Sequence, residues 1–257
     1  MIAEAWQWLT TPATSQARRL GFLKESIAMQ ARFQRCRSAW QPHYQRCQQV
    51  IREAMAQAGQ QRVLLIMGAG LLEDIPLAEA SERFEQVWLV DMVFLRKARR
   101  RAAAFANVRL IEADITESLT PLANGQDDVA RPRRWLDQPV DCVVSLNLLT
   151  QLPMVPVRSR LKRSSKNHDA QLETLGKELI EAHLAYLSRF SGVRCLICDR
   201  WVEERRADAR LVDELDPAWD VALPSTVREW GWTVIPFGES AEAPHNERIH
   251  RVGASIW

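Results

Sequence analysis

Residues 63–70 read Val-Leu-Leu-Ile-Met-Gly-Ala-Gly, a continuous apolar run that ends in two glycines around one alanine. Such a run is typical of a strand that is covered on both faces, as in a parallel sheet. The glycines allow the backbone to turn sharply and to approach a neighbour without a Cβ in the way. This stretch therefore predicts the first strand of an α/β sheet, with a tight turn at its carboxyl end.

Four more apolar runs follow and are separated by segments with helical spacing. The predicted strands are 86–90, 107–111, 140–146 and 193–199, and the predicted helices are 76–84, 94–105, 117–123 and 170–190. Alternating strands and helices imply right-handed crossovers and a mostly parallel sheet.

The end of the chain has a different pattern. Residues 231–236 and 248–257 read as two strands joined by a loop too short for a helix, which predicts an antiparallel hairpin at the sheet edge. The predicted fold is therefore α/β and Rossmann-like, a doubly wound, mostly parallel sheet of seven strands with a C-terminal antiparallel hairpin.

The first sixty residues are predicted to form an N-terminal helical extension. Apolar residues recur there at helical spacing, at Leu20, Leu23, Ile27 and Phe33. Thr11-Pro12 predicts a helix start, and a second helix is expected over 42–58 with Gly59 as its C-cap. We expect residues 1–61 to form a helical cap over the substrate entrance and 62–257 to form the α/β domain.

The composition is that of an ordinary globular protein, but the charge is unevenly distributed. The 257 residues are 47% apolar and 26% charged, which excludes a disordered chain and a disulfide-dense small fold. The net charge of +2 combines +6 over residues 1–62 with −4 over the rest. We interpret the basic N-terminal part mainly as a solvated helix face.

Nucleic acid is kept as a candidate partner because of a second basic segment. The predicted polar loop 156–169 contains Arg158, Arg160, Lys162, Arg163 and Lys166. His168 lies in the same loop and is expected to be solvated. A basic loop alone is weak support, so no partner is assigned from it.

The five cysteines predict neither a disulfide framework nor a metal site. Cys195 and Cys198 lie three residues apart on a predicted strand, so their side chains point to opposite faces and cannot bind one ion. We expect reduced core thiols. Because no secretory signal and no apolar run of about 18 residues is present, we expect a cytoplasmic protein without a membrane partner.

Candidate ligand-binding residues follow the first three predicted strands. Ligands of open parallel sheets bind beyond the carboxyl ends of the strands, near the point where the strand order reverses. Gly68 and Gly70 follow the first strand, and Asp91 ends the second, where a carboxylate offers two acceptor oxygens to a ribose diol. Asp114 follows the third strand and can accept from an adenine amine, with Ile115 against the ring.

Two acidic residues distinguish between the cofactors that contain adenosine. The dinucleotide fingerprint requires glycine at position 73, where this chain has Glu73. Glu73 and Asp74 place negative charge at the helix start where a pyrophosphate would sit, which disfavours NAD. S-adenosylmethionine has no phosphate and carries a sulfonium and an ammonium, so the charge pattern favours it.

Together these segments resemble the class I S-adenosylmethionine-dependent methyltransferases over residues 62–257. The resemblance rests on the glycine turn at 68–70, Asp91, the segment 113–115, the strand end Ser-Leu-Asn-Leu-Leu-Thr at 145–150 and the closing hairpin. It implies an enzyme that transfers a methyl group from S-adenosylmethionine to a small-molecule or macromolecular acceptor, which the sequence does not identify.

The resemblance also implies roles for individual residues. The glycines would line the methionine moiety, Asp91 would hold the ribose, Asp114 would meet the adenine, and the backbone near Leu146 and Asn147 would border the sulfonium. The cofactor-binding candidates are Gly68, Ala69, Gly70, Glu73, Asp91, Met92, Asp114, Ile115, Leu146 and Asn147.

Candidates for catalysis are few, because this chemistry depends mainly on position. Holding two reactants in line can supply roughly 7–11 kcal/mol of barrier lowering, without an obvious catalytic side chain. The candidates are Asn147, Asp199 with Arg200 at the end of the fifth strand, and His183 on the preceding helix. His43 would reach the cofactor only if the N-terminal helices fold over it.

Two alternative functions stay open. Ile66 stands where the family often has an acid, and the glycine turn is short, so a methyltransferase-like interaction module without activity is one alternative. A nucleotide-cofactor oxidoreductase is the other, and Glu73 disfavours it.

Overall fold

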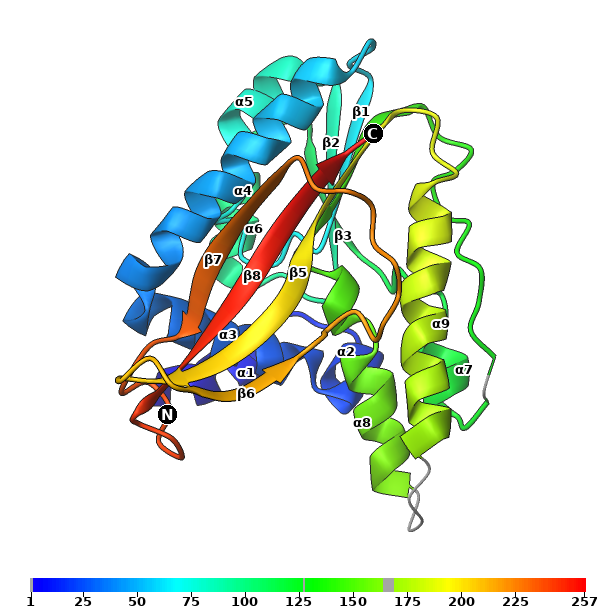
Figure 1. Ribbon diagram of the computed structural model, residues 1–257. Helices are drawn as coiled ribbons and strands as arrows, with labels where there is room; N and C mark the ends of the chain where they lie inside the picture. Colours follow the sequence, from blue (N-terminus) through cyan, green and yellow to red (C-terminus); the bar gives the residue numbers. More distant parts are fainter. Residues whose placement is uncertain (1, 127, 164–168) are drawn as a thin grey trace.

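The computed structural model describes residues 2–126, 128–163 and 169–257 (Figure 1). The first half of the chain forms α1 (Ile2–Thr10), α2 (Ser15–Leu20), α3 (Phe22–Arg35), α4 (Arg37–Gln57), β1 (Val63–Met67), α5 (Leu77–Arg83), β2 (Gln86–Asp91), α6 (Arg96–Ala102), β3 (Val108–Glu112) and α7 (Leu119–Ala123). The second half forms β4 (Val140–Leu146), a 3-10 turn (Leu149–Gln151), α8 (Met154–Arg163), α9 (Asp169–Leu187), β5 (Val193–Arg206), β6 (Leu211–Leu215), β7 (Arg228–Ile235) and β8 (Asn246–Ile256).

The sheet confirms the predicted Rossmann-like α/β fold. The strand order is β3-β2-β1-β4-β5-β8-β7, and β6 pairs with β5 off this path. The strands from β3 to β5 are parallel, whereas β8 is antiparallel to both β5 and β7. The predicted C-terminal hairpin therefore forms, with β8 inside the sheet and β7 at its edge.

The sheet has eight strands where seven were expected. β5 continues past Asp199 to Arg206, and the added strand β6 pairs with this extension. The extension contains Glu-Glu-Arg-Arg at 203–206, and all five residues of β6 are exposed. Strands without a buried face lack the apolar runs from which the other strands were predicted.

Helices cover both faces of the sheet (Figure 1). One core cluster joins α4, α5 and α6 to one face, and a second joins α9 to the other. Cys195 belongs to the first cluster and Cys198 to the second, so the prediction that they face opposite ways is confirmed. All five cysteines are free and buried, as expected.

Three predicted features of the N-terminal helices are wrong. Thr11-Pro12 lies in the break after α1, and α2 is capped instead by the Thr14 hydroxyl, which accepts from the Ala17 N–H at 3.1 Å. Helix α4 begins at Arg37 and includes Pro42, because the burial of its apolar face outweighs one missing backbone hydrogen bond. Gly59 is not its C-cap, since the helix ends at an extended Ala58.

The predicted basic loop 156–169 is also helical in its first half. Helix α8 runs to Arg163, with Arg158 paired to Glu25 at 2.9 Å. Lys166 and His168, and the side chains of Lys162 and Arg163, lie outside the described residues. Among the described helices, none combines the length and apolar character that a membrane crossing needs.

Helix α4 is part of the main core. Trp40 is fully buried, and its indole Nε1–H donates to the carbonyl of Val234 in β7 at 3.0 Å. Residues Cys47, Val50 and Ile51 belong to the same cluster as β1 and β4. The chain positions before and after residue 61 therefore share one core, to which Phe33 of α3 also belongs.

We predict that Trp40→Ala lowers the free energy of unfolding by about 3–5 kcal/mol, the usual cost of truncating a buried tryptophan. Chemical denaturation monitored by circular dichroism measures the change in one cooperative transition. Lys24→Ala, at an exposed position of α3, is the control and should leave stability nearly unchanged. A mild effect of Trp40→Ala would show that α4 is a separable cap.

Candidate active site

The order of the strands reverses between β1 and β4, and a glycine turn lies at this point. Gly68 and Gly70 have φ of +82° and +41°, a region that favours glycine. A Cβ on Gly68 would lie 2.4 Å from the carbonyl oxygen of Leu146, at the end of β4. Only glycine allows the two strand ends to come this close, so the turn and Asn147 lie side by side.

Asp91 reaches the glycine turn from the end of β2. Its Oδ2 accepts from the Gly70 N–H at 2.8 Å, and its Oδ1 accepts from the Met92 N–H at 2.7 Å. Burial raises the pKa of the Asp91 carboxyl, while these backbone donors act in the opposite direction. The backbone N–H of Val93 acts on this carboxyl as well, and the predicted role toward a ribose diol stays a prediction.

Glu73, one of the two acidic residues after the glycine turn, is paired with basic residues of α6. The Glu73 carboxylate pairs with Lys97 of α6 at 2.5 Å and with Arg101 at 3.5 Å. Arg101 also donates to the carbonyl of Leu72 at 2.9 Å. These cations balance the charge of Glu73, so its carboxylate is held by α6. The charge argument from Glu73 and Asp74 for a sulfonium ligand stays a prediction.

Asp114 and Ile115 lie at the end of β3, where their contacts stabilise the chain itself. The Asp114 carboxylate accepts from the Thr116 N–H at 2.9 Å and from the Leu119 N–H, at the start of α7, at 2.8 Å. Ile115 is buried in the α9-side core. These are the contacts of a turn and a helix start, and the adenine roles of both residues stay predictions.

Two of the predicted catalytic residues, Asn147 and Asp199, lie on the α4 side of the sheet. Asn147 has a left-handed backbone with φ of +49° and contacts His43 and Cys47 of α4. Asp199 accepts a hydrogen bond from the Thr150 hydroxyl at 3.4 Å. Side-chain alternation along β5 gives Asp199 the same face as Ile197, which belongs to the α4-side cluster.

Arg200 does not share this location, contrary to expectation. Neighbouring residues of a strand point to opposite faces, and Arg200 donates to the Pro224 carbonyl at 3.0 Å and to the Ser255 hydroxyl at 2.9 Å. It therefore braces the segment before β7 instead of facing a substrate.

His183 lies on the other side of the sheet from Asn147. Its Nε2 is 2.9 Å from the hydroxyl of Ser145 in β4, and both residues are buried between α9 and the sheet. Burial lowers the pKa of His183 to about 4. None of its described contacts reaches the glycine turn, so its predicted catalytic role gains no support from this position.

We predict that His183 makes the protein less stable in acid. Its folded pKa of about 4 lies below its usual value of 6.5, so the unfolded chain binds the proton first as the pH falls between these values. The stability lost across this window is up to roughly 3 kcal/mol. Denaturation of His183→Gln from pH 7 to pH 4 should show a shallower loss than wild type.

The exposed His245 provides the control for this measurement. His245→Gln should retain the wild-type dependence on pH. Equal slopes for His183→Gln and wild type would contradict the burial of an uncharged imidazole at this site.

His43 is the candidate that comes nearest to the predicted crevice. Its Nε2 is 3.2 Å from Asn147 Nδ2 and 3.4 Å from Cys47 Sγ, and its Nδ1 accepts from the indole N–H of Trp230 at 3.0 Å. Its ring stacks on Trp232, with centroids 3.9 Å apart. Burial lowers the pKa of His43 to about 3, which keeps the ring uncharged.

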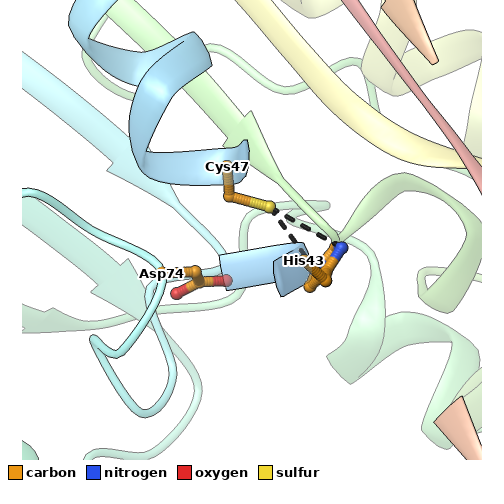
Figure 2. Close-up of side chains that lie close together, drawn as sticks. All are labelled: His43, Cys47 and Asp74. Atoms are coloured by element: carbon orange, nitrogen blue, oxygen red, sulfur yellow. Dashed lines mark hydrogen bonds between the residues drawn. The ribbon is translucent and has the colours of Figure 1, made fainter. Parts of the chain in front are cut away.

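Asp74 connects this group to the glycine turn. Asn147 Nδ2 donates to Asp74 Oδ2 at 3.1 Å, and burial raises the pKa of Asp74 to about 7. Figure 2 shows His43 and Cys47 one turn apart on α4, with Asp74 beside them on the loop after β1. Sequence reasoning missed this group because its members come from positions far apart in the chain.

His43, Cys47 and Asp74 have the donor types of a metal site, with ligand atoms within 4.8 Å of one another. However, a metal bound at Nε2 would require the ring proton on Nδ1, which faces the Trp230 N–H at 3.0 Å. Two N–H groups would then oppose each other. Burial also raises the pKa of the Cys47 thiol well above its usual value, which disfavours the thiolate that metals bind.

We therefore predict that wild-type protein takes up no Co²⁺ at this cluster, as measured by the thiolate-to-cobalt charge-transfer band. Trp230→Phe removes the opposing N–H and should gain some of this absorption. A stoichiometric band in wild type that Cys47→Ser abolishes would contradict the assignment.

Comparison with known proteins adds little to this geometry. No family model matches the chain, and no curated protein matches it. Similar solved structures include the N-methyltransferase NodS from Bradyrhizobium japonicum WM9 in complex with S-adenosyl-l-homocysteine (11% identity, 81% of this chain and 85% of that one, TM-score 0.36).

Two further structures are a 1,6-didemethyltoxoflavin-N1-methyltransferase from Burkholderia thailandensis (15% identity, 94% and 91% covered, TM-score 0.37) and the 23S rRNA methyltransferase ErmE (10% identity, 79% and 66% covered, TM-score 0.33). All three TM-scores lie below 0.5, so these similarities are too weak to assign a fold or a function to this chain. The fold assignment therefore rests on the strand order of this chain.

Proposed function

We propose that this chain is an S-adenosylmethionine-dependent methyltransferase of class I that transfers a methyl group to an acceptor yet to be identified. One observation carries the proposal. At the reversal between β1 and β4, the glycine turn meets the Asp91 carboxylate on one side and Asn147 on the other. Adenosine-containing ligands bind at such a point in doubly wound sheets.

The cofactor would occupy the crevice that these strand ends border. Gly68, Ala69 and Gly70 offer a backbone without bulky side chains, and Asp91 with Met92 borders the place for the ribose. The bound cofactor would supply an activated methyl group. The role of the protein would be to orient donor and acceptor and to exclude water, which supports this chemistry without a strong general base.

The segment α1–α3 supports a cap over this crevice. Leu23 and Ile27 of α3 pack against Val93 and Leu95 in the loop after β2, and Leu71 joins the same cluster. We propose that these helices cover the cofactor, whereas α4 belongs to the sandwich. The free, buried cysteines support a reducing compartment, and we propose the cytoplasm.

Nucleic acid is a weaker candidate for the acceptor than the charge pattern suggested. Arg32 and Arg35 both pair with Glu239, and Arg52 pairs with Glu79. These ion pairs neutralise part of the basic N-terminal segment, which reduces the field that would attract phosphates.

An interaction module without activity is the second candidate. Leu72 and Ile75, directly after the glycine turn, are fully buried in the α4-side core, and Arg101 holds the carbonyls around them. A segment that packs its own side chains this tightly has less freedom to adapt to a ligand. This observation favours a chain that has the methyltransferase-like fold but does not bind the methyl donor.

Calorimetry with S-adenosylhomocysteine, S-adenosylmethionine and NAD tests the proposal. We expect the first two to bind, and to raise the melting temperature as any ligand of the native state does. Asp91→Ala should lose this binding. Glu112→Ala, at the adjacent position of β3 and paired with Arg99, is the matched control and should retain it.

The other possible results of the calorimetry distinguish between the alternative functions. Absence of heat and of a thermal shift for both sulfur compounds would contradict the enzyme assignment and favour the interaction module. Binding of NAD instead would favour a nucleotide-cofactor oxidoreductase.

A further inference from the structure

A set of buried polar atoms from the end of β4 and from β5, β7 and β8 lacks hydrogen-bond partners. Within the described part of the chain, these atoms are Asn147 Oδ1, Asp199 Oδ1, Trp232 Nε1 and His250 Nδ1. His250 Nδ1 lies 3.0 Å from Asp199 Oδ2, but without the geometry of a hydrogen bond. Buried polar groups are nearly always paired, so several unpaired atoms in one place call for an explanation.

The fold brings these residues together from the end of β4 and from the middle of β5, β7 and β8. Trp232 of β7 and His250 of β8 are register partners, and their rings meet edge-on with centroids 5.8 Å apart. Trp232 stacks on His43, which contacts Asn147. A continuous series of contacts therefore runs from Asn147 at the crevice to the His250–Asp199 pair.

The unpaired atoms define the ligand that would complete them. Asp199 Oδ1 and Asn147 Oδ1 each need a donor, and the Trp232 Nε1–H needs an acceptor. The aromatic face of Trp232 is already occupied by protein, because His43 stacks on its ring and Trp40 meets the ring edge-on with centroids 5.3 Å apart. The Trp232 N–H is therefore the group that a ligand would engage, rather than the aromatic face.

The charge of the site narrows the ligand further. The side chain of Asp199 is 12% exposed, and among the described residues only His250 comes within ion-pair distance of it, with Nδ1 3.0 Å from Oδ2. A phosphate or carboxylate would be repelled by Asp199, whereas an amino group would donate to it. A hydroxyl or ring nitrogen beside the amino group of the ligand would accept from the Trp232 Nε1–H.

We propose that Asp199, His250, Trp232 and the Asn147 side chain form the acceptor subsite, which binds a small molecule with an amino group beside a hydroxyl or ring-nitrogen lone pair. The assignment as acceptor rests on the proposed function, because the subsite meets the cofactor crevice at Asn147. His43 is a positioning residue that holds Trp232 and Asn147 in place.

Ethanolamine is the probe, and the indole N–H resonances of the tryptophans are the readout. In ¹H–¹⁵N spectra of the full chain, Trp232→Phe identifies the Trp232 signal. Titration with millimolar ethanolamine should shift this signal saturably, while ethylene glycol and acetate at equal concentrations should shift it at least fivefold less. Asp199→Asn and His250→Gln should each weaken the shift, and Asp213→Asn, on the exposed strand β6, should not.

The results separate this subsite from the proposed function. An unchanged Trp232 signal, or an equal shift with acetate, would overturn the subsite. Water would then be the partner of the unpaired polar atoms. Retention of the full shift in both Asp199→Asn and His250→Gln would overturn it as well. The titration is made without the methyl donor. If S-adenosylhomocysteine does not bind in calorimetry, the site is not a methyl-acceptor site, but the amine binding measured by titration still stands.

Discussion

The close contact between Gly68 and the Leu146 carbonyl is the constraint on which the site depends. A Cβ at position 68 would lie 2.4 Å from that oxygen, so β1 and β4 can end side by side only because residue 68 is glycine. This contact places the glycine turn next to Asn147. Asn147 has a left-handed backbone, and its side chain contacts Cys47 of α4. One close approach of two strands therefore brings the glycine turn, Asn147 and its contacts on α4 together.

The central strands were predictable from the sequence because burial on both faces leaves an unbroken apolar run. Strands β1 and β4 match their predicted bounds, and β2 differs by one residue. The extension of β5 and strand β6 were not predictable in this way, since their exposed, charged residues carry no burial pattern. The predicted helix break at Pro42 was wrong for a related reason. Local propensity places a break there, whereas the buried Trp40 and His43 keep α4 continuous.

The positions of the candidate site residues at strand ends were predictable, but their partners were not. The spacing of Asp91 from Gly70 correctly placed a carboxylate at the glycine turn. The neutralisation of Glu73 depends on Lys97 and Arg101, which reach it only after the crossover helix has folded back over the loop. Likewise, His250 meets Asp199 only through the antiparallel pairing of β5 with β8. Such pairs depend on topology, and a linear pattern of residue types does not encode them.

The two sides of the site differ in how their polar groups are satisfied, and this difference bears on function. Around the glycine turn, the carboxylates of Asp91 and Glu73 already have protein partners, so a cofactor must add to or replace existing contacts. Around Asp199 and Trp232, buried polar atoms lack partners, so a ligand would complete contacts that folding leaves open. Because unpaired buried groups reduce stability, the second arrangement is the more informative of the two. It connects the fold to a ligand through chemistry that packing alone does not explain.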